Sequence, residues 1–324
     1  MPHNKKQHFV PQLLQRFFSI DKENIGSFHI KSGRVGPSPI AKTAQKDWLY
    51  KVNEKDRTSI EHIFEHIERN AQPIIERIQH KDFTLSSEEI DKMFIFVVAQ
   101  LMRTPKAAIA MGAVLDFCIQ NDIKEVCKEV EDGIRDMSNL PMQASIAIPK
   151  VAEHLSGKRF LFVCNDTNVK FLLSDNPACI FSPVAEVAED KHIEYKMKKQ
   201  EAFSGYMLYL PLGPTVGIIC FDDDYYDFSQ SVYIDATPAD VKTLNRLEVI
   251  SASHIIMHLE GTFSQEEIAE ALAERNTERC KRYQKTIYTP IDKSFSLTGL
   301  NLDENILVYK INKYAIVKNG QETQ

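Results

Sequence analysis

Two polar residues interrupt an otherwise apolar helical segment, and they are the first candidates for chemistry in this sequence. Gln100 and Arg103 lie three residues apart, so they share one face of the helix predicted over 86–105. An arginine in such a helix requires a carboxylate or carbonyl partner, because an unpaired buried charge costs several kcal/mol. Arg103 therefore forms a structural ion pair between two helices, or it binds an anionic ligand.

A histidine precedes the first predicted helix. His8 stands three residues before Pro11, and proline is favoured at helix starts. In this position His8 acts as a ligand or general base, or it satisfies a backbone carbonyl group. The helix that follows has an apolar stripe at helical spacing, formed by Leu13, Leu14, Phe17 and Phe18.

Two more polar residues follow a predicted strand. Asp175 and Asn176 come shortly after the apolar segment 170–173. Side chains of these types either cap backbone groups in an Asx turn, or project from the strand end into a cleft, where open sheets place their sites. The sequence leaves both interpretations open.

The segment 58–80 predicts an amphipathic helix. It contains His62-Ile-Phe-Glu-His66, which matches the H-x-x-E-H pattern of zinc metalloproteases. At about 100° per residue both histidines fall opposite the apolar face, so we expect them to point to solvent and to hold no catalytic zinc. Glu68 flanks the apolar face and can reach a buried partner such as Arg103. The apolar face comprises Ile60, Ile63, Phe64, Ile67, Ala71, Ile74, Ile75 and Ile78.

The remaining elements are predicted from hydrophobic period and from start and stop signals. The helix that carries Arg103 begins with a capping box formed by Ser86 and Glu89. Further helices are expected at 105–121, 123–138, 149–155, 237–259 and 264–285. Strands are expected at 27–30, 47–52, 159–164, 170–173, 207–210 and 216–221, with a turn region at 33–39 and a surface loop at 185–204.

These elements predict an α+β fold. The first half is helix-dominated, and the second half holds a small β-sheet with helices packed on it. We expect one globular unit over residues 1–324. Its subdivisions are a mainly helical part (1–156), a part with the β-sheet and helices (157–290), and a C-terminal tail (291–324).

The composition narrows the functional classes. The 324-residue chain has a net charge of −6 and a pI of about 6.0, so it lacks the global basic signature of nucleic-acid-binding proteins. No apolar segment approaches the roughly 18 residues that span a membrane, and residues 1–8 lack the apolar core of a signal peptide. The six cysteines are scattered without a C-x-x-C motif. We therefore expect a cytoplasmic protein with no membrane partner.

Three segments together resemble an uncharacterised family of mostly bacterial proteins. The first is H-[FY]-V-P-Q, here His8–Gln12, although the family often has a leucine where this chain has Gln15. The second is Q-x-x-R-[TS]-P at a helix end, here Gln100–Pro105. The third is [TS]-D-N-P after a strand, here Ser174–Pro177, followed by L-P-L-[GS]-P at Leu210–Pro214. The resemblance implies that one polar cluster forms from His8, Gln100, Arg103, Asp175, Asn176 and Asn245.

The first functional hypothesis is a hydrolase that cleaves a phosphodiester or another phosphate-containing substrate. In this hypothesis His8 is the general acid or base, and Asp175 orients the histidine or a divalent metal ion. A toxin-like or antiviral nuclease or phosphodiesterase that acts on nucleic acid is its specific form. The substrate-binding residues would be Gln100, Arg103, Asn176 and Asn245, supported by Gln12 and Glu68.

The second hypothesis is a non-catalytic protein that senses a nucleotide or another anion with the same residues. The acidic balance of the chain favours it over nonspecific nucleic-acid binding. An activity lost in both His8→Ala and Asp175→Asn, with folding intact, would identify an enzyme. The sequence leaves the choice between enzyme and binding protein open.

Overall fold

The computed structural model describes residues 6–47, 49, 57–107, 148–155, 157–184, 194–195, 205–275 and 316–317. Several expectations lie wholly or largely outside these residues. They are the helices at 105–121 and 123–138, the loop at 185–204, and the second half of the helix at 264–285. The described part contains both helices and several sheets, which confirms the α+β class.

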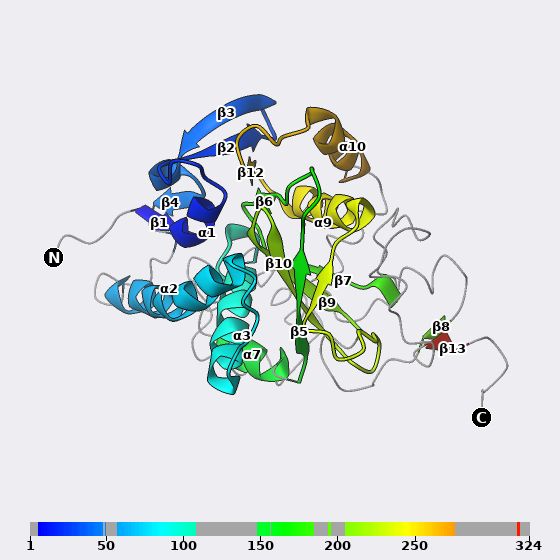
Figure 1. Ribbon diagram of the computed structural model, residues 1–324. Helices are drawn as coiled ribbons and strands as arrows, with labels where there is room; N and C mark the ends of the chain where they lie inside the picture. The colour runs from blue at the N-terminus through cyan, green and yellow to red at the C-terminus, as the bar shows by residue number, and fades with distance from the viewer. Residues whose placement is uncertain are drawn as a thin grey trace, which may run out of the picture.

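Five of the described helices pack in two groups (Figure 1). In the first group α2 packs on α3, and α3 packs on α7; in the second group α10 packs on α9. The helices are α1 (Gln12–Phe17), α2 (Arg57–Gln79), α3 (Ser87–Met102), α7 (Ile148–Leu155), α9 (Pro238–Ser251) and α10 (Gln265–Arg275), with a short 3₁₀ helix η1 (Ile40–Lys42).

A five-stranded sheet of strand order β11-β5-β10-β9-β7 occupies the middle of the molecule (Figure 1). The strand β11 runs parallel to β5, and the other neighbours are antiparallel. The strands of this sheet are β5 (Arg159–Cys164), β7 (Cys179–Phe181), β9 (Met207–Gly213), β10 (Val216–Phe221) and β11 (Tyr233–Asp235).

A four-stranded antiparallel sheet joins early and late parts of the chain. Its order is β3-β2-β12-β6, so the N-terminal hairpin pairs with a strand that follows α9. Its strands are β2 (Asn24–His29), β3 (Arg34–Pro39), β6 (Leu173–Ser174) and β12 (Ile255–His258). Two short pairs complete the described strands: β1 (Lys6–His8) with β4 (Gln45–Asp47), and β8 (Glu194–Tyr195) with β13 (Ile316–Val317).

The start of α3 follows the predicted capping box. The Ser86 hydroxyl accepts a hydrogen bond from the Glu89 backbone N–H at 3.3 Å, and the Glu89 carboxylate accepts one from the Ser86 N–H at 2.9 Å. The helix then turns a wide apolar surface into the core, where Phe94 stacks on Phe160 of β5 with ring centroids 4.0 Å apart. The cap and the apolar surface together explain why this segment is helical and buried.

The residues predicted for the apolar face of α2 from Phe64 to Ile78 are buried. Ile63 was expected on this face, but its side chain is 48% exposed. It lies one residue before Phe64, about 100° around the helix, and therefore at the margin of the buried stripe.

The turn predicted at 33–39 is wrong, because Arg34–Pro39 forms strand β3. Its glycine and proline residues are typical of turns, which explains the error. Pro37 and Pro39 are tolerated because β3 is an edge strand that pairs only with β2 among the described strands.

The helix predicted to run to residue 259 ends at Ser251, and β12 follows it. The carboxylate of Asp175 accepts hydrogen bonds from the backbone N–H groups of Ser253 at 2.6 Å and His254 at 2.8 Å. These donors would bond to carbonyl groups of the preceding turn if the helix continued. Their capture by Asp175 favours the change from helix to strand.

Candidate functional site

The three segments that carry the family resemblance meet at the C-terminal end of α3. Arg103 Nη2 donates to the carbonyl oxygen of His8 at 2.5 Å. The next residue, Thr104, donates from its hydroxyl to Asn176 Oδ1 at 2.6 Å. Two consecutive side chains therefore tie the helix end to the His8 segment and to the Ser174–Pro177 segment.

Arg103 forms the ion pair with Glu68 that the sequence suggested. Its Nη1 lies 2.6 Å from Glu68 Oε1, and its guanidinium lies 4.3 Å from the ring centroid of Phe64. The arginine is only 4% exposed. A buried cation of this kind requires its partners, and here they are a carboxylate on α2 and the backbone of β1.

His8 is half-buried at the end of β1. Its Nε2 lies 3.3 Å from the carbonyl oxygen of Ile40, and the Gln12 side-chain nitrogen lies 3.4 Å from both ring nitrogens. Burial lowers the pKa of His8. The hydrogen bond to Ile40 raises this pKa, and the neighbouring charge of Arg103 lowers it. A neutral ring with its proton on Nε2 fits these contacts, because that proton donates to Ile40 and Nδ1 accepts from Gln12.

A chain of contacts leads from His8 to an exposed cation. Gln12 bridges the histidine to Arg16, whose Nη2 donates to Gln12 Oε1 at 2.7 Å. Lys22 follows, with its Nζ 2.9 Å from the Arg16 carbonyl oxygen and 5.9 Å from the ring centroid of Phe17. The short helix α1 positions these residues because 12 and 16 are one helical turn apart.

These residues border a groove with a volume of about 510 Å³. Residues of β1, α1 and the segment after it line one part of the groove, and residues of α2 line the rest. Helices α1 and α2 can be located in Figure 1. Three cations, three carboxylates and an apolar patch face it. Its lining residues are His8, Gln12, Leu13, Arg16, Phe17, Lys22, Glu65, Glu68, Arg69, Gln72 and Glu76.

Asp175 lies in a different environment. Its carboxylate is 3% exposed and accepts the two N–H bonds from Ser253 and His254. Burial raises its pKa, although the N–H bonds oppose that shift. The structure therefore pairs Asp175 with the start of β12 and gives it no hydrogen bond to His8.

Asn176 is also held by the fold. Besides its bond from Thr104, its Nδ2 donates to Ser251 Oγ at 2.6 Å, and Ser251 Oγ donates to the Asn176 carbonyl oxygen at 2.8 Å. Lys106 reaches the same end of α9 and donates to the Ser251 carbonyl oxygen at 2.8 Å. Burial lowers the pKa of Lys106 to about 8.

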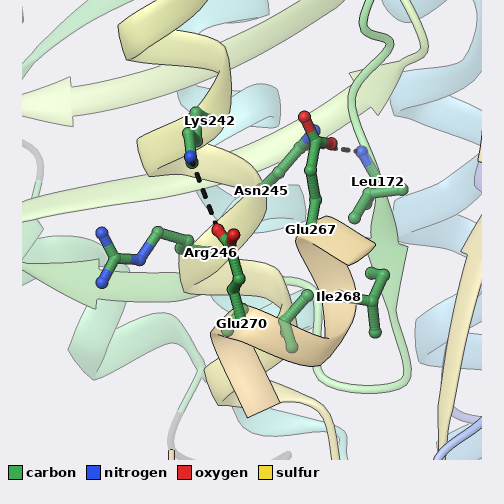
Figure 2. A pocket seen from close by; sticks show the side chains of 9 residues that line it. Leu172, Lys242, Asn245, Arg246, Glu267, Ile268 and Glu270 are labelled. Carbon is green, nitrogen blue, oxygen red and sulfur yellow. Dashed lines mark hydrogen bonds and ion pairs between the residues drawn. The ribbon is translucent and has the colours of Figure 1, made fainter. Parts of the chain in front are cut away.

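Asn245 holds α9 against the segment before β6 (Figure 2). Its Oδ1 accepts from the Leu172 N–H, and its Nδ2 donates to the Lys170 carbonyl oxygen, both at 2.9 Å. It borders a pocket of about 130 Å³ between α9 and α10, where Lys242 and Glu270 face each other at 3.6 Å. The amide of Asn245 thus bonds on both sides to backbone groups and serves this packing.

Glu248 is a buried acid that our sequence reasoning missed. Its carboxyl group accepts from the Ser174 N–H at 2.7 Å and from the Cys179 thiol at 3.4 Å, and the residue is fully buried. Burial raises the pKa of Glu248 to about 8. The available signal was its position between the apolar residues Leu247 and Val249, three residues after Asn245.

Gln100 is fully buried on α3, and its amide nitrogen donates to the Phe96 carbonyl oxygen at 3.4 Å. It does not line the groove of His8. Of the six residues expected in one cluster, two lie on the groove side, His8 and Arg103, and three lie on the α9 side, Asp175, Asn176 and Asn245. The sixth, Gln100, is buried on α3.

The described residues give no support to a metal centre. His62 and His66 are exposed, as predicted, and contact Glu65 and Asn70. Within the described ranges no group of three His, Cys, Asp or Glu side chains could hold a metal ion. No helix in this part of the chain is long and apolar enough to cross a membrane.

Comparison with known proteins gives one match. The family model described as "Protein of unknown function (DUF4238)" matches residues 6–262, which contain both the groove and the α9 side. No curated protein and no solved structure matches the chain.

Proposed function

The chain belongs to the DUF4238 family, and we propose that it binds a small phosphate-type anion in the groove between α1 and α2. The observation that carries this proposal is Arg16, an exposed guanidinium held by Gln12 next to a half-buried histidine. Lys22 and Arg69 line the same groove and add two further cations. Phosphate groups are well matched by arginine, which offers several fixed donors.

This proposal gives the anion-binding role to Arg16 in place of Arg103. The guanidinium of Arg103 already bonds to Glu68 and to the His8 carbonyl oxygen. It acts in this proposal as a support for the backbone of His8. Asp175, Asn176 and Asn245 support the fold of the α9 side and do not contact the ligand.

Titration calorimetry with inorganic phosphate tests the proposal. We expect the wild type to bind phosphate and Arg16→Gln to bind about tenfold more weakly, because one charge-assisted contact is lost. Arg34→Gln is the matched control, since Arg34 is an exposed arginine outside the groove. Equal affinities in all three proteins would contradict an anion site at Arg16.

A second candidate function is hydrolysis of a phosphodiester in the same groove. The observation that favours it is the position of His8, which lines the groove with Nδ1 3.4 Å from the Gln12 side-chain nitrogen. Burial lowers the pKa of His8, which favours the neutral ring that a general base needs. Nδ1 could take a proton from an attacking water molecule once Gln12 moves aside. The Ile40 carbonyl would hold the ring orientation through Nε2, a role that backbone carbonyls fill for many histidines.

The chromogenic diester bis(4-nitrophenyl) phosphate tests this second candidate. We expect a rate that rises with pH through the lowered pKa of His8, below 6.5, and then stays level. His8→Ala should abolish it, and Asp175→Asn should retain it when folding is intact. Phosphate binding without hydrolysis of the diester would contradict the hydrolase and support only the anion-binding function. Intact total DNA and RNA after induced expression would contradict the nuclease form.

A further inference from the structure

The charges in the groove restrict how large an anion it can take. Glu65, Glu68 and Glu76 of α2 line the groove together with the three cations Arg16, Lys22 and Arg69. A nucleic-acid strand needs a run of cations that follows successive phosphates. In this groove three carboxylates accompany three cations, so it lacks such a run and suits a ligand with one phosphate group.

The groove also has an apolar wall. Leu13 and Phe17 are half-buried, and the Lys22 ammonium group lies over the Phe17 ring, 5.9 Å from its centroid. Lys22 is exposed, so a planar ligand that stacks on Phe17 can take the place of its ammonium group. An aromatic ring that is partly open to a groove offers a stacking surface for a planar ligand ring. Inorganic phosphate or a sugar phosphate would leave this surface unused.

Hydrogen-bonding groups continue along α2. Gln72 Nε2 donates to Glu76 Oε1 at 2.8 Å, one helical turn apart. Their remaining acceptors are of the kind that bind sugar hydroxyl groups or an exocyclic amine. The lining residues from Glu65 to Glu76 extend for about 16 Å at 1.5 Å per residue, and the volume is typical of small-molecule sites.

We propose that the ligand is a single nucleoside monophosphate. Arg16 binds the phosphate, Phe17 stacks on the base, and Gln72 with Glu76 accepts from the ribose or the base. This inference rests on the proposed anion-binding function and specifies the class of ligand for the same groove. It also predicts that the groove binds a free nucleotide in preference to a nucleic-acid strand.

Calorimetry on the full chain with four probes tests the inference. The probes are adenosine monophosphate, ribose 5-phosphate, inorganic phosphate and a short single-stranded oligonucleotide. We expect the nucleotide to bind about tenfold more tightly than ribose 5-phosphate, the gain that stacking of one base provides.

Phe17→Leu isolates the stacking surface. We expect this variant to lose most of the preference for the nucleotide and to keep its affinity for ribose 5-phosphate, because leucine retains the apolar contact but not the ring. The matched control is Phe83→Leu, a half-buried phenylalanine that stacks on Phe162 and does not line the groove. Thermal melts establish that both variants fold.

The outcomes separate this inference from the function on which it rests. Equal binding of the nucleotide and ribose 5-phosphate, or a preference unchanged by Phe17→Leu, would overturn the inference and leave anion binding intact. Tighter binding of the oligonucleotide than of the nucleotide would also overturn it. Binding of none of the probes would contradict the anion-binding function as well.

Discussion

The groove side and the α9 side use the same kinds of polar residues in different ways. On the α9 side, Asp175 and Asn245 bond to backbone groups of neighbouring segments and are buried. On the groove side, Arg16 is exposed and its guanidinium donates a hydrogen bond to Gln12. The first arrangement holds strands and helices together, whereas the second leaves donors that a ligand can reach.

The comparison shows that a polar residue in a segment that carries the resemblance can have its hydrogen-bonding groups taken up by the fold. Buried backbone N–H groups need an acceptor. The Asp175 carboxylate is the acceptor for two of these groups, those of Ser253 and His254. Such a residue stabilises the fold through these two hydrogen bonds. Variants that separate stability from ligand affinity therefore test the division directly.

The largest effect is expected where the groove side meets the core. Arg103→Leu leaves Glu68 without its partner and should lower the free energy of unfolding by about 3 kcal/mol or more, measured by urea unfolding. The matched control is Arg159→Leu, which breaks a more exposed pair with Asp223 and should lose less than about 1 kcal/mol. A smaller loss for Arg103→Leu than for the control would show that the buried pair does not support this region.

Asp175→Ala should lower the free energy of unfolding by about 2–3 kcal/mol. Its removal leaves the buried N–H groups of Ser253 and His254 without their acceptor. We expect the phosphate affinity of the folded protein to be unchanged, as measured by calorimetry below the unfolding temperature. An Asp175→Ala protein of normal stability that fails to bind phosphate would show that Asp175 contributes to the ligand site. It would contradict the difference between the two sides.

Glu248→Gln should change how stability depends on pH. The folded protein keeps Glu248 protonated up to a pKa of about 8, whereas the unfolded carboxyl group ionises near 4.5. Unfolding between these values releases a proton, so stability falls with rising pH by up to about 1.4 kcal/mol per unit from this group. Urea unfolding at pH 6 and pH 8 should show a shallower decline in the glutamine variant.

Two other buried ionisable groups near Glu248 also affect how stability depends on pH. Asp175 also has a raised pKa and contributes in the same direction in both proteins. The lowered pKa of Lys106, about 8, affects stability mainly between that value and 10.5, because stability is lost as pH falls through it. An identical decline in wild type and Glu248→Gln would contradict a buried, protonated Glu248.

The groove side should respond to pH through ligand affinity. As pH falls below 6.5 toward the lowered pKa of His8, the ring gains a charge beside Arg16. The ratio of the phosphate affinities of the wild type and His8→Gln should then rise a few-fold from pH 7 to pH 5, in calorimetry on both proteins. The ratio is the measure because phosphate itself loses charge over this range in both proteins. Since the folded pKa of His8 is lowered, protonation also reduces stability over this range. Equal pH dependence in both proteins would remove His8 from the anion site.

The smallest effect is expected for the H-x-x-E-H sequence. The double variant of His62→Ala and His66→Ala should change the free energy of unfolding by less than about 0.5 kcal/mol, because both side chains are exposed. Added zinc should leave the melting temperatures of wild type and variant alike. A zinc-dependent rise that only the wild type shows would reveal a metal site on α2.

Local features of this fold were predictable because their causes lie close together in the sequence. The capping box of Ser86 and Glu89 depends on a spacing of three residues, and the bounds of β5, Arg159–Cys164, follow from an apolar run. The pairing of Glu68 with Arg103 was also expected, because both face the same apolar interior on their helices.

Long-range capture of backbone groups was not predictable from one sequence. The end of α9 depends on Asp175, whose partners Ser253 and His254 lie on a different segment of the chain. The same limit applies to the candidate site. Arg16 comes one residue after Gln15 in the sequence, and its place in a groove beside α2 emerges from tertiary packing.

The strand order β3-β2-β12-β6 has a consequence for how the protein is made. On the ribosome the hairpin β2–β3 emerges early, but its neighbour β12 is synthesised more than two hundred residues later. At ordinary translation rates this interval is on the order of ten seconds or longer. During that time the inner edge of β2 exposes unpaired backbone groups, so the nascent chain has its greatest need of a chaperone before Ile255–His258 leaves the exit tunnel.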